Sequence, residues 1–400
     1  MTAIDEQTGS GLPPREYDLL RAAIRDTIWT VLDPLAEQID RTESIPYDIV
    51  LPALRECGAF GLLVPAEYGG SGLSIAQYLP IIAEFAKSHG GIRALVHVHN
   101  SFAHALSEIG NTEQRAAVLH GAVTGERSLA FALTEPGHGT GADLGSTAVR
   151  DGDSYLINGA KWLITNSDLA SHFLVFAKTN PSQVSAFLVE RHAPGLTIEA
   201  MPETMGCKGG EHGRLTFTDT RVPKSALVGA DGDGRVHLER ALEVSRVFIA
   251  ASSLGTAEQA LDLSLRHARQ RVTFGKPIAE RQAVQRYLAE MAIDVYALRG
   301  MLADAAAKWD AGHRLPAESA MVKQFGLEAV GRVTDRALLV HGGIGYTRQL
   351  PIERLYRDAR LNWLEEGPPT IQYLVAAREL VAGYTFDDAF DPAHGDLTWG

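Results

Sequence analysis

A glutamate near the C-terminus, Glu366, stands where a carboxylate could act as a base. It follows the mostly apolar run 361–364 and precedes a Gly-Pro-Pro sequence, after which a helical pattern resumes. The prolines stiffen the backbone, so the side chain would be held in one direction. A carboxylate that is partly removed from water and aimed is what a general base requires. An ordinary solvated loop acid is the more common case, and Glu365 is an adjacent competitor.

Four other segments carry residue types that suit anionic or flat ligands. The loop 131–144 combines glycines and hydroxyls after an apolar strand, so it could expose backbone N–H groups to a phosphate or a heterocycle. The segment 155–166, YLINGAKWLITN, reads as a tight hairpin at Asn158-Gly159. The turn 269–277, RQRVTFGKP, has arginines that could clamp a phosphate or simply cap a helix. The glycines of 341–346 allow close backbone approach.

Three regions must position these segments. Residues from about 16 to 121 have apolar side chains at helical spacing, and so do those from about 237 to 384. The stretch between them has short apolar runs bounded by turn residues, which is typical of strands. We therefore predict a mainly α protein with an inserted β domain. It would comprise an N-terminal helical bundle at 1–122, a middle β-barrel-like domain at 123–236, and a C-terminal four-helix bundle at 237–400.

Composition limits the classes of function. The chain has 400 residues, of which 45% are hydrophobic, and a net charge of −12, which argues against a nucleic-acid or anionic-membrane partner bound through bulk charge. Cys57 and Cys207 are its only cysteines, so neither a disulfide framework nor a metal site is expected. There is no apolar signal core at the N-terminus and no apolar run of transmembrane length. We expect a soluble, cytoplasmic protein.

Taken together, in this order, the five segments resemble the acyl-CoA dehydrogenase flavoprotein family from about residue 15 to 382. The shared motifs are the TEPG loop, the ITN hairpin, the R-x-T-F-G turn, the GG-x-G turn and the E-G-x-x-x-I-Q segment. The resemblance implies FAD between the β domain and the C-terminal helices. It also implies that Glu366 removes the α proton of an acyl thioester while the β hydride passes to the flavin, which gives a trans-2-enoyl thioester. The backbone N–H of Glu366 would polarise the thioester carbonyl.

The resemblance also implies which residues meet the cofactor and the substrate. The cofactor contacts would be Phe131, Leu133, Thr134, Gly139, Thr140, Leu163, Thr165, Arg271, Phe274, Gln282, Leu339, Gly342, Gly343, Pro368 and Thr370. The substrate contacts would be Thr140, Arg246, Glu366, Gly367 and His97. Residues of the R-x-T-F-G and GG-x-G turns reach FAD from a neighbouring subunit in that family, so a dimer or tetramer is implied. Ser245 stands where some members carry the base, and serine cannot take that role, which favours Glu366.

Several positions depart from the family pattern. Gly141, Leu163, Leu339 and Pro368 stand where the family usually has aspartate, tryptophan, glutamine and threonine. FAD could therefore bind more weakly or in a different arrangement. Three histidines, His97, His99 and His104, would give one helical stretch a polar face in or beside the acyl pocket.

The sequence leaves several functional alternatives open. The same fold could act on a substrate bound to an acyl carrier protein in secondary metabolism, or serve as a flavin oxidase or monooxygenase. A non-catalytic acyl-thioester-binding protein is a further alternative. The resemblance implies a role in fatty acid metabolism and an electron-transfer flavoprotein or similar acceptor. It does not fix chain length, carrier or electron acceptor.

Overall fold

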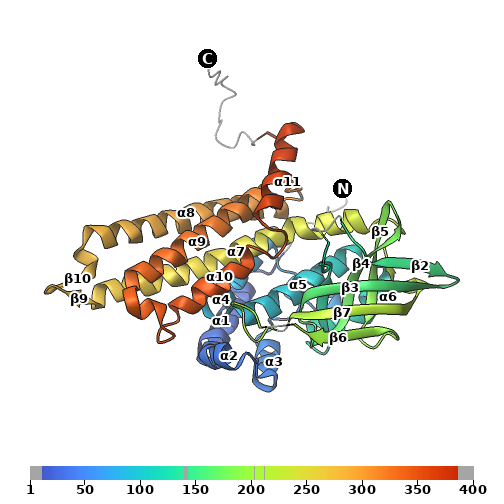
Figure 1. Cartoon of the computed structure of the whole chain (residues 1–400), viewed down its shortest axis with the longest axis horizontal. Helices are drawn as coiled ribbons and strands as arrows, with labels where there is room; N and C mark the ends of the chain where they lie inside the picture. The colour runs from blue at the N-terminus through green and yellow to red at the C-terminus, as the bar shows by residue number, and fades with distance from the viewer. Residues whose placement is uncertain (1–10, 139–142, 202, 211, 386–400) are drawn as a thin grey trace, which may run out of the picture.

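The computed structural model describes residues 11–138, 143–201, 203–210 and 212–385, which form a helical, a sheet and a second helical region in chain order (Figure 1). The first region comprises α1 (Pro14–Thr27), α2 (Ala36–Thr42), α3 (Tyr47–Glu56), α4 (Ile75–Ser88), α5 (Gly90–Ile109) and α6 (Thr112–Val123). The sheet comprises β1 (Ser128–Ala132), β2 (Thr147–Asp151), β3 (Ser154–Thr165), β4 (Ala170–Asn180), β5 (Gln183–Glu190), β6 (Leu196–Ala200), β7 (His212–Pro223) and β8 (Leu227–Val228). The last region comprises α7 (Gly234–Gln270), the short strands β9 (Val272–Thr273) and β10 (Lys276–Pro277), α8 (Gln282–Asp310), α9 (Glu318–His341), α10 (Ile352–Asn362) and α11 (Pro369–Val381). The predicted order of helices, sheet and helices is confirmed.

Local sequence sets where the N-terminal helices begin. Ser74 and Gln77 form a capping box at α4, in which the Ser74 hydroxyl accepts from the Gln77 N–H at 3.3 Å and Gln77 Oε1 accepts from the Ser74 N–H at 3.4 Å. Asn111 and Gln114 do the same at α6. Such boxes satisfy backbone donors that the first turn of a helix leaves free. Between them α5 is buried along most of its length, which places polar side chains such as His97 inside the molecule.

The described strands of the middle region form one sheet in the order β6-β7-β3-β2-β4-β5-β8, with β1 parallel to β4. The predicted hairpin at Asn158-Gly159 is wrong, because β3 runs without interruption through both residues. The tight turn lies earlier, at Gly152-Asp153, where Asp151 of β2 faces Ser154 of β3. Gly159 instead marks a register shift in β3, and a Cβ there would lie 2.4 Å from the Ser146 hydroxyl.

The two helical regions share an apolar core. Side chains from α1, α3, α4 and α5 pack in the same cluster as side chains from α7, α8, α9 and α10. Where α7 crosses α4, a Cβ on Gly255 would lie 1.9 Å from the Ala83 carbonyl oxygen, so only glycine allows this approach. The crossing fixes α7, which carries Ser245 and Arg246, against the N-terminal helices.

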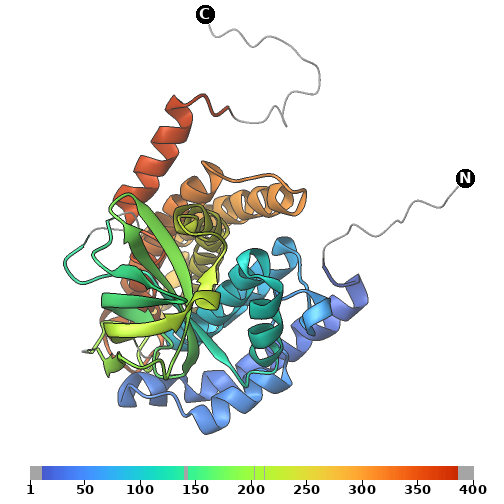
Figure 2. The same cartoon turned by 90° about the vertical axis from the view of Figure 1, so that its right-hand side faces the viewer.

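The three regions lie side by side rather than as separate bodies. In Figure 2 the sheet lies beside the N-terminal helices, while α11 extends away from the body. Gln372 is the only residue of α11 that is buried, among those the structure describes. None of the described helices is long and apolar enough to cross a membrane. The domain boundaries after residues 122 and 236 stay predictions.

Candidate active site

Glu366 lies in the turn between α10 and α11, at an unusual backbone conformation. Its φ is 52° and that of Gly367 is 93°, so two consecutive residues are left-handed. For a residue with a Cβ this conformation costs about 1 kcal/mol, so the surrounding contacts must hold it. Gln372 supplies two of them, since its Nε2 donates to the carbonyl oxygens of Glu366 at 3.0 Å and Gly367 at 2.8 Å.

Lys323 of α9 holds the same turn from inside the protein. Its side chain is fully buried, and Nζ donates to the carbonyl oxygens of Glu365 and Gly367. Burial lowers the pKa of Lys323 to about 8, against the opposing charges of Glu366 and Glu365. A buried ammonium therefore bridges the peptide carbonyls on either side of the candidate base. No feature of the local sequence around Lys323 indicates this role.

The structure separates the two adjacent acids. Both carboxylate oxygens of Glu365 pair with the Arg93 guanidinium of α5 at 2.8 Å, in a two-pronged arrangement. Although burial opposes ionisation, the charge and hydrogen bonds of Arg93 lower the pKa of Glu365 to about 2. Arg93 also donates to Asn362 Oδ1 at 3.1 Å. Glu365 is thus committed to a structural ion pair, and its charge is balanced.

The Glu366 carboxylate has a different environment. The Ser245 hydroxyl of α7 donates to Oε1 at 2.9 Å, and His97 Nε2 of α5 lies 3.7 Å from the same oxygen. The side chain is 20% exposed, so it is neither fully buried nor freely solvated. Burial lowers the pKa of Arg246, the next residue on α7, and the negative charge of Glu366 opposes that effect. A held carboxylate in a partly dry site can act as a general base.

A first group of predicted cofactor contacts gathers at one end of the sheet. Leu133 and Thr134 follow β1, which carries Phe131, and the Thr134 carbonyl accepts from the backbone N–H of Trp162 in β3 at 2.9 Å. A register shift in β3 puts Leu163 at a φ of 55° with its side chain 44% exposed, and Thr165 ends the strand.

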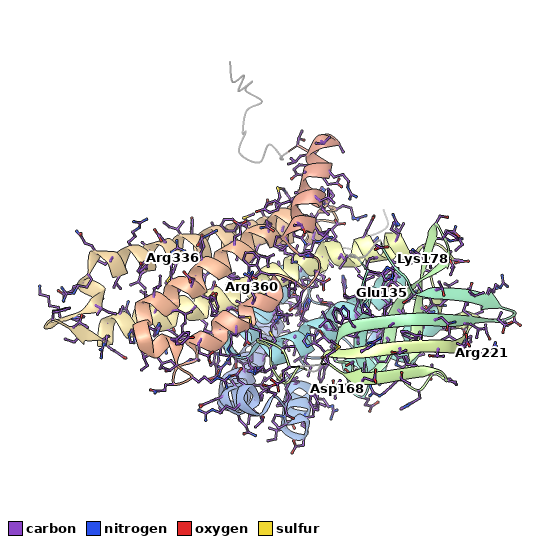
Figure 3. All side chains as sticks on the ribbon, in the orientation of Figure 1. Glu135, Asp168, Lys178, Arg221, Arg336 and Arg360 are labelled. Atoms are coloured by element: carbon purple, nitrogen blue, oxygen red, sulfur yellow. The ribbon has the colours of Figure 1, made fainter. Side chains whose placement is uncertain are left out.

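A buried ion pair that the sequence did not suggest fastens this loop to β3. Lys161 Nζ lies 2.6 Å from Glu135 Oε1 and donates to the Leu133 carbonyl at 3.1 Å. Glu135 also accepts from the N–H groups of Gly145 and Ser146, beyond the loop. Burial lowers the pKa of Lys161 to about 8 in spite of its partner. Glu135 stands at the sheet side of the molecule in Figure 3. Glu135 belongs to the TEPG motif and Lys161 to the KWLIT motif. Membership of these motifs is the one sequence signal that could have marked the two residues as important for the site.

The second group of predicted cofactor contacts lies far from the first. Arg271 and Gln282 flank the β9–β10 turn, whose tip residue Phe274 is 96% exposed, at the end of the molecule opposite the sheet in Figure 1. Leu339, Gly342 and Gly343 lie at the exposed end of α9. One chain therefore does not bring the two groups together. Among the others, Pro368 caps α11 and Thr370 is exposed in its first turn. Gly139 and Thr140 lie outside the described residues.

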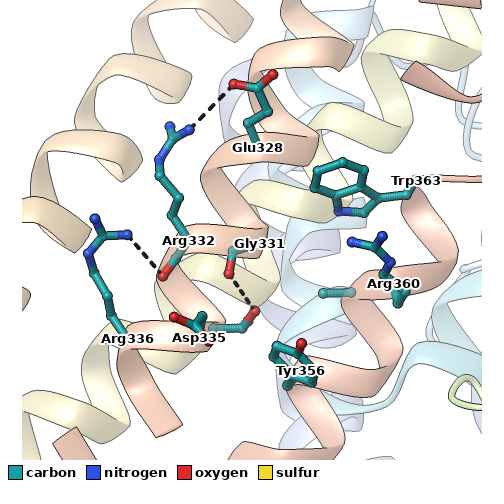
Figure 4. Close-up of a pocket in the computed structure, with 10 residues that line it drawn as sticks. Glu328, Gly331, Arg332, Asp335, Arg336, Tyr356, Arg360 and Trp363 are labelled. Atoms are coloured by element: carbon teal, nitrogen blue, oxygen red, sulfur yellow. Dashed lines mark hydrogen bonds and ion pairs between the residues drawn. The ribbon is translucent and has the colours of Figure 1, made fainter. Parts of the chain in front are cut away.

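A cavity of about 400 Å³ lies on α9 and α10 (Figure 4). In it the Arg360 guanidinium lies 4.4 Å from the centre of the Trp363 ring, and Arg332 pairs with Glu328 at 3.5 Å. None of the predicted site residues lines it. The described residues contain no group of three or more His, Cys, Asp or Glu that could hold a metal ion.

Known protein families match this chain along most of its length. The family descriptions "Acyl-CoA dehydrogenase, N-terminal domain", "middle domain" and "C-terminal domain" match residues 14–126, 130–220 and 232–381. The chain belongs to the acyl-CoA dehydrogenase family. Members are flavin-dependent oxidoreductases that act on a CH–CH bond, so the resemblance seen in the sequence is confirmed at this level.

Individual relatives support the assignment to the acyl-CoA dehydrogenase family. An acyl-CoA dehydrogenase of Bacillus subtilis is 35% identical, over 92% of this chain and 99% of the relative. The acryloyl-CoA reductase (NADH) of Anaerotignum propionicum is 36% identical, over 92% and 95%. Butyryl-CoA dehydrogenase from Megasphaera elsdenii has a similar structure, with a TM-score of 0.88 and 29% identity over 95% of this chain and 100% of that one.

The residues of this chain fit FAD at two separate places. At the sheet, Leu163 and Thr134 expose an apolar side chain and a hydroxyl, which suit a flat ring with polar edges, on segments that the Trp162 N–H to Thr134 carbonyl bond joins. At the opposite end, no atom would lie within 4 Å of a Cβ on Gly342 or Gly343, so the backbone there is open to a ligand. The exposed ring of Phe274 lies at the same end. The two places lie at opposite ends of one chain.

Proposed function

We propose that this protein catalyses the α,β-dehydrogenation of an acyl thioester, with Glu366 as the base that removes the α proton. The observation that supports this most strongly is the difference between Glu365 and Glu366. Arg93 neutralises the first, whereas the second keeps a partly accessible carboxylate beside Ser245 and Arg246. A base that works at a weakly acidic carbon needs this combination of a fixed direction and limited water.

Each residue near the turn has a part in the proposed reaction. FAD, when bound, accepts the hydride that leaves the β carbon. Glu366 takes the α proton, so the product is a trans-2-enoyl thioester. The backbone N–H of Glu366 would donate to the thioester oxygen, where negative charge develops as the proton leaves. Lys323 and Gln372 hold the turn so that this N–H and the carboxylate keep their relative positions. Arg246 would lie beside the CoA or carrier portion of the substrate.

The same proposal covers the cofactor and the assembly. Phe131, Leu133, Thr134, Leu163 and Thr165 would hold one part of FAD, and Arg271, Phe274, Gln282, Leu339, Gly342 and Gly343 of a neighbouring subunit would hold the other. The separation of the two groups in one chain supports a homodimer or a tetramer. Electrons would then leave to an electron-transfer flavoprotein or a similar acceptor.

Anaerobic flavin reduction tests the proposal. The purified holoenzyme is mixed with a panel of acyl-CoA thioesters and one acyl carrier protein thioester, and loss of the flavin absorbance is followed. We expect reduction by at least one thioester, and a loss of at least 10³-fold in Glu366→Gln, since an amide cannot take up the proton. Glu328→Gln, which changes a partly exposed acid of α9 that accepts from the Tyr373 hydroxyl, serves as the matched control. Flavin reduction by the Glu366→Gln protein at the wild-type rate would refute the assignment of the base.

A further inference from the structure

His97 is a buried polar side chain to which the proposed reaction gives no role in proton transfer. Its ring is 1% exposed, and Nδ1 lies 3.3 Å from the Ser101 hydroxyl on the next turn of α5. Nε2 has no hydrogen-bond partner among the described residues and lies 3.7 Å from Glu366 Oε1. Nearly all buried polar groups in proteins have a partner, so a ring nitrogen left free beside the base calls for an explanation.

The surroundings hold the imidazole in place. The Phe248 ring of α7 meets it edge-on, with ring centres 6.2 Å apart and an angle of 82°. Ser245 and His97 both approach Oε1 of Glu366, whereas no hydrogen bond from the described part of the chain reaches Oε2. One oxygen of the carboxylate thus faces the protein and the other is left for the substrate.

The distances suit a hydrogen bond that forms only after proton uptake. If Nδ1 carries the ring proton and donates to the Ser101 hydroxyl, Nε2 carries no proton and can only accept a hydrogen bond. It then has no hydrogen to donate to the carboxylate of Glu366, but it can accept one from the carboxyl group once Glu366 has gained a proton. A half-turn of the carboxyl group, which is a soft torsion, would bring the O–H to Nε2. Hydrogen bonds are often long in ligand-free sites and tighten with substrate.

We propose that His97 is a positioning residue for Glu366, whose Nε2 stabilises the protonated carboxyl group after the α proton has been removed. The inference rests on the proposed function, because it requires Glu366 to be the base. In the proposed reaction the Cα–H bond breaks and its proton goes to Glu366, while the hydride of the β carbon would pass to FAD. His97 favours the proton on Glu366 because it binds only the neutral form of that group.

A pH dependence follows from the pairing. Two groups that share a proton bind the first one more readily than either group alone. Protonation of the pair then removes the free base, so the rate falls on the acid side. Without the imidazole, that acid limb moves to lower pH.

Other charged groups surround the pair. Burial opposes ionisation of Glu365, but the charge of Arg93 outweighs it and lowers the pKa of Glu365 to about 2, so this acid stays ionised near neutral pH. Burial lowers the pKa of His212. Lys323, with a pKa of about 8, titrates on the basic side. The charged and titratable groups around His97 and its neighbours Glu365 and Glu366 are Arg93, His212, Arg246 and Lys323.

Exchange of the α hydrogens for deuterium tests the inference without hydride transfer. The probe is (methylthio)acetyl-CoA, in which sulfur replaces the β carbon and no β hydrogen can leave. The holoenzyme is incubated with it in D₂O across a pH series, and mass spectrometry follows deuterium uptake. For His97→Gln we expect exchange to slow by roughly tenfold at neutral pH, the size of one hydrogen bond, and its acid limb to move to lower pH.

Matched variants make the outcome specific. His104→Gln removes a partly buried histidine of α5, about 10 Å along the helix from His97 and beside Glu108 and Arg240 rather than Glu366. This variant should leave the pH profile of exchange unchanged. Ser101→Ala keeps the imidazole but removes the partner of Nδ1. It should therefore also move the acid limb of exchange to lower pH, by less than His97→Gln does. Flavin absorbance and the thermal unfolding midpoint report whether each variant is folded. If His97→Gln does not fold, the acid limb of Ser101→Ala tests the inference in its place, and an unchanged limb would overturn it.

The possible outcomes separate the two proposals. Exchange by Glu366→Gln at the wild-type rate, or no exchange by the wild-type protein, would overturn the proposed function and this inference with it. If Glu366→Gln abolishes exchange while His97→Gln and Ser101→Ala keep the wild-type rate and acid limb, the inference alone fails.

Discussion

Replacement of Lys323 by methionine should change how stability depends on pH. The side chain is fully buried, and burial lowers its pKa from 10.5 to about 8. Lys323 therefore keeps its proton up to about pH 10.5 in the unfolded chain but only up to about pH 8 in the folded one. Between these values the unfolded state binds more protons, so the free energy of unfolding rises with pH.

The size of this contribution follows from the two pKa values. One pKa unit corresponds to about 1.4 kcal/mol, so the change from 10.5 to about 8 corresponds to about 3 kcal/mol. This penalty for burying the charge is fully present below pH 8 and is relieved as pH rises towards 10.5. Lys323→Met has no such group. The unfolding free energy of the wild type minus that of the variant should therefore increase by about 3 kcal/mol over this interval.

Lys87 provides a matched control of opposite sign. Burial tends to lower its pKa, but the hydrogen bond with Glu84 and the charge of Glu258 outweigh burial and raise it. Its contribution is fully present below the unfolded pKa and is lost only as pH rises through the higher folded value. Urea unfolding of the wild type, Lys323→Met and Lys87→Met from pH 7 to 10.5 measures the three dependences. The unfolding free energy of the wild type minus that of Lys87→Met should not increase between pH 8 and 10.5.

The same variant should also impair the reaction. Without the ammonium, the carbonyl oxygens of Glu365 and Gly367 lose a buried donor, and the turn that directs Glu366 is free to shift. A displacement of about 1 Å at a base can cost on the order of 10²-fold in rate. The reasoning is refuted if the stability difference stays flat from pH 8 to 10.5, or if anaerobic flavin reduction by Lys323→Met matches the wild type.

Two further substitutions probe the rest of the site. Glu365→Gln leaves the Arg93 guanidinium buried without its anion, so urea unfolding at pH 7 should show a loss of roughly 3–5 kcal/mol. The contribution of the Glu365 charge to stability is present above pH 4.5 and is lost as pH falls towards 2, so the difference in unfolding free energy between wild type and Glu365→Gln should become smaller at low pH. A difference below about 1 kcal/mol at pH 7 would contradict the ion-pair role. Phe274→Ala should change the unfolding free energy by less than about 0.5 kcal/mol, since the ring is 96% exposed, yet lower FAD retention on gel filtration. Equal retention would show that this tip does not meet the cofactor.

The sequence predicted the arrangement of regions well because hydrophobic period is a local property. The helical spacing before residue 121 and after 237 and the short apolar runs between them correspond to observed helices and strands. The hairpin was misplaced because Asn158-Gly159 is a strong turn signal, while the true turn at Gly152-Asp153 lies between less distinctive strands. In the structure Gly159 lies within β3, where the absence of a side chain allows Ser146 to approach closely. Local turn chemistry alone does not tell a hairpin from a bulge.

The partners of the candidate base could not be predicted in the same way. Arg93 and Lys323 come from α5 and α9, and each meets the 365–367 turn only because the helices pack together. The sequence ruled out Ser245 as a base, but it did not show that the serine donates to Glu366. These partners lie 42 to 272 positions from the turn, and pairing at such separations leaves no pattern in a single sequence.

The position of Glu366 depends on helices from both helical regions. Its carboxylate is held from α7 through Ser245 and faced from α5 by His97, while its backbone is held from α9 through Lys323. The close crossing of α4 and α7 at Gly255 and the Arg93–Glu365 pair both join the N-terminal helices to this turn. Neither acid could be assigned from its own surroundings in the sequence, since both are glutamates in one loop. What distinguishes them is which helix each one meets, so the proposal of Glu366 as the base rests on tertiary packing.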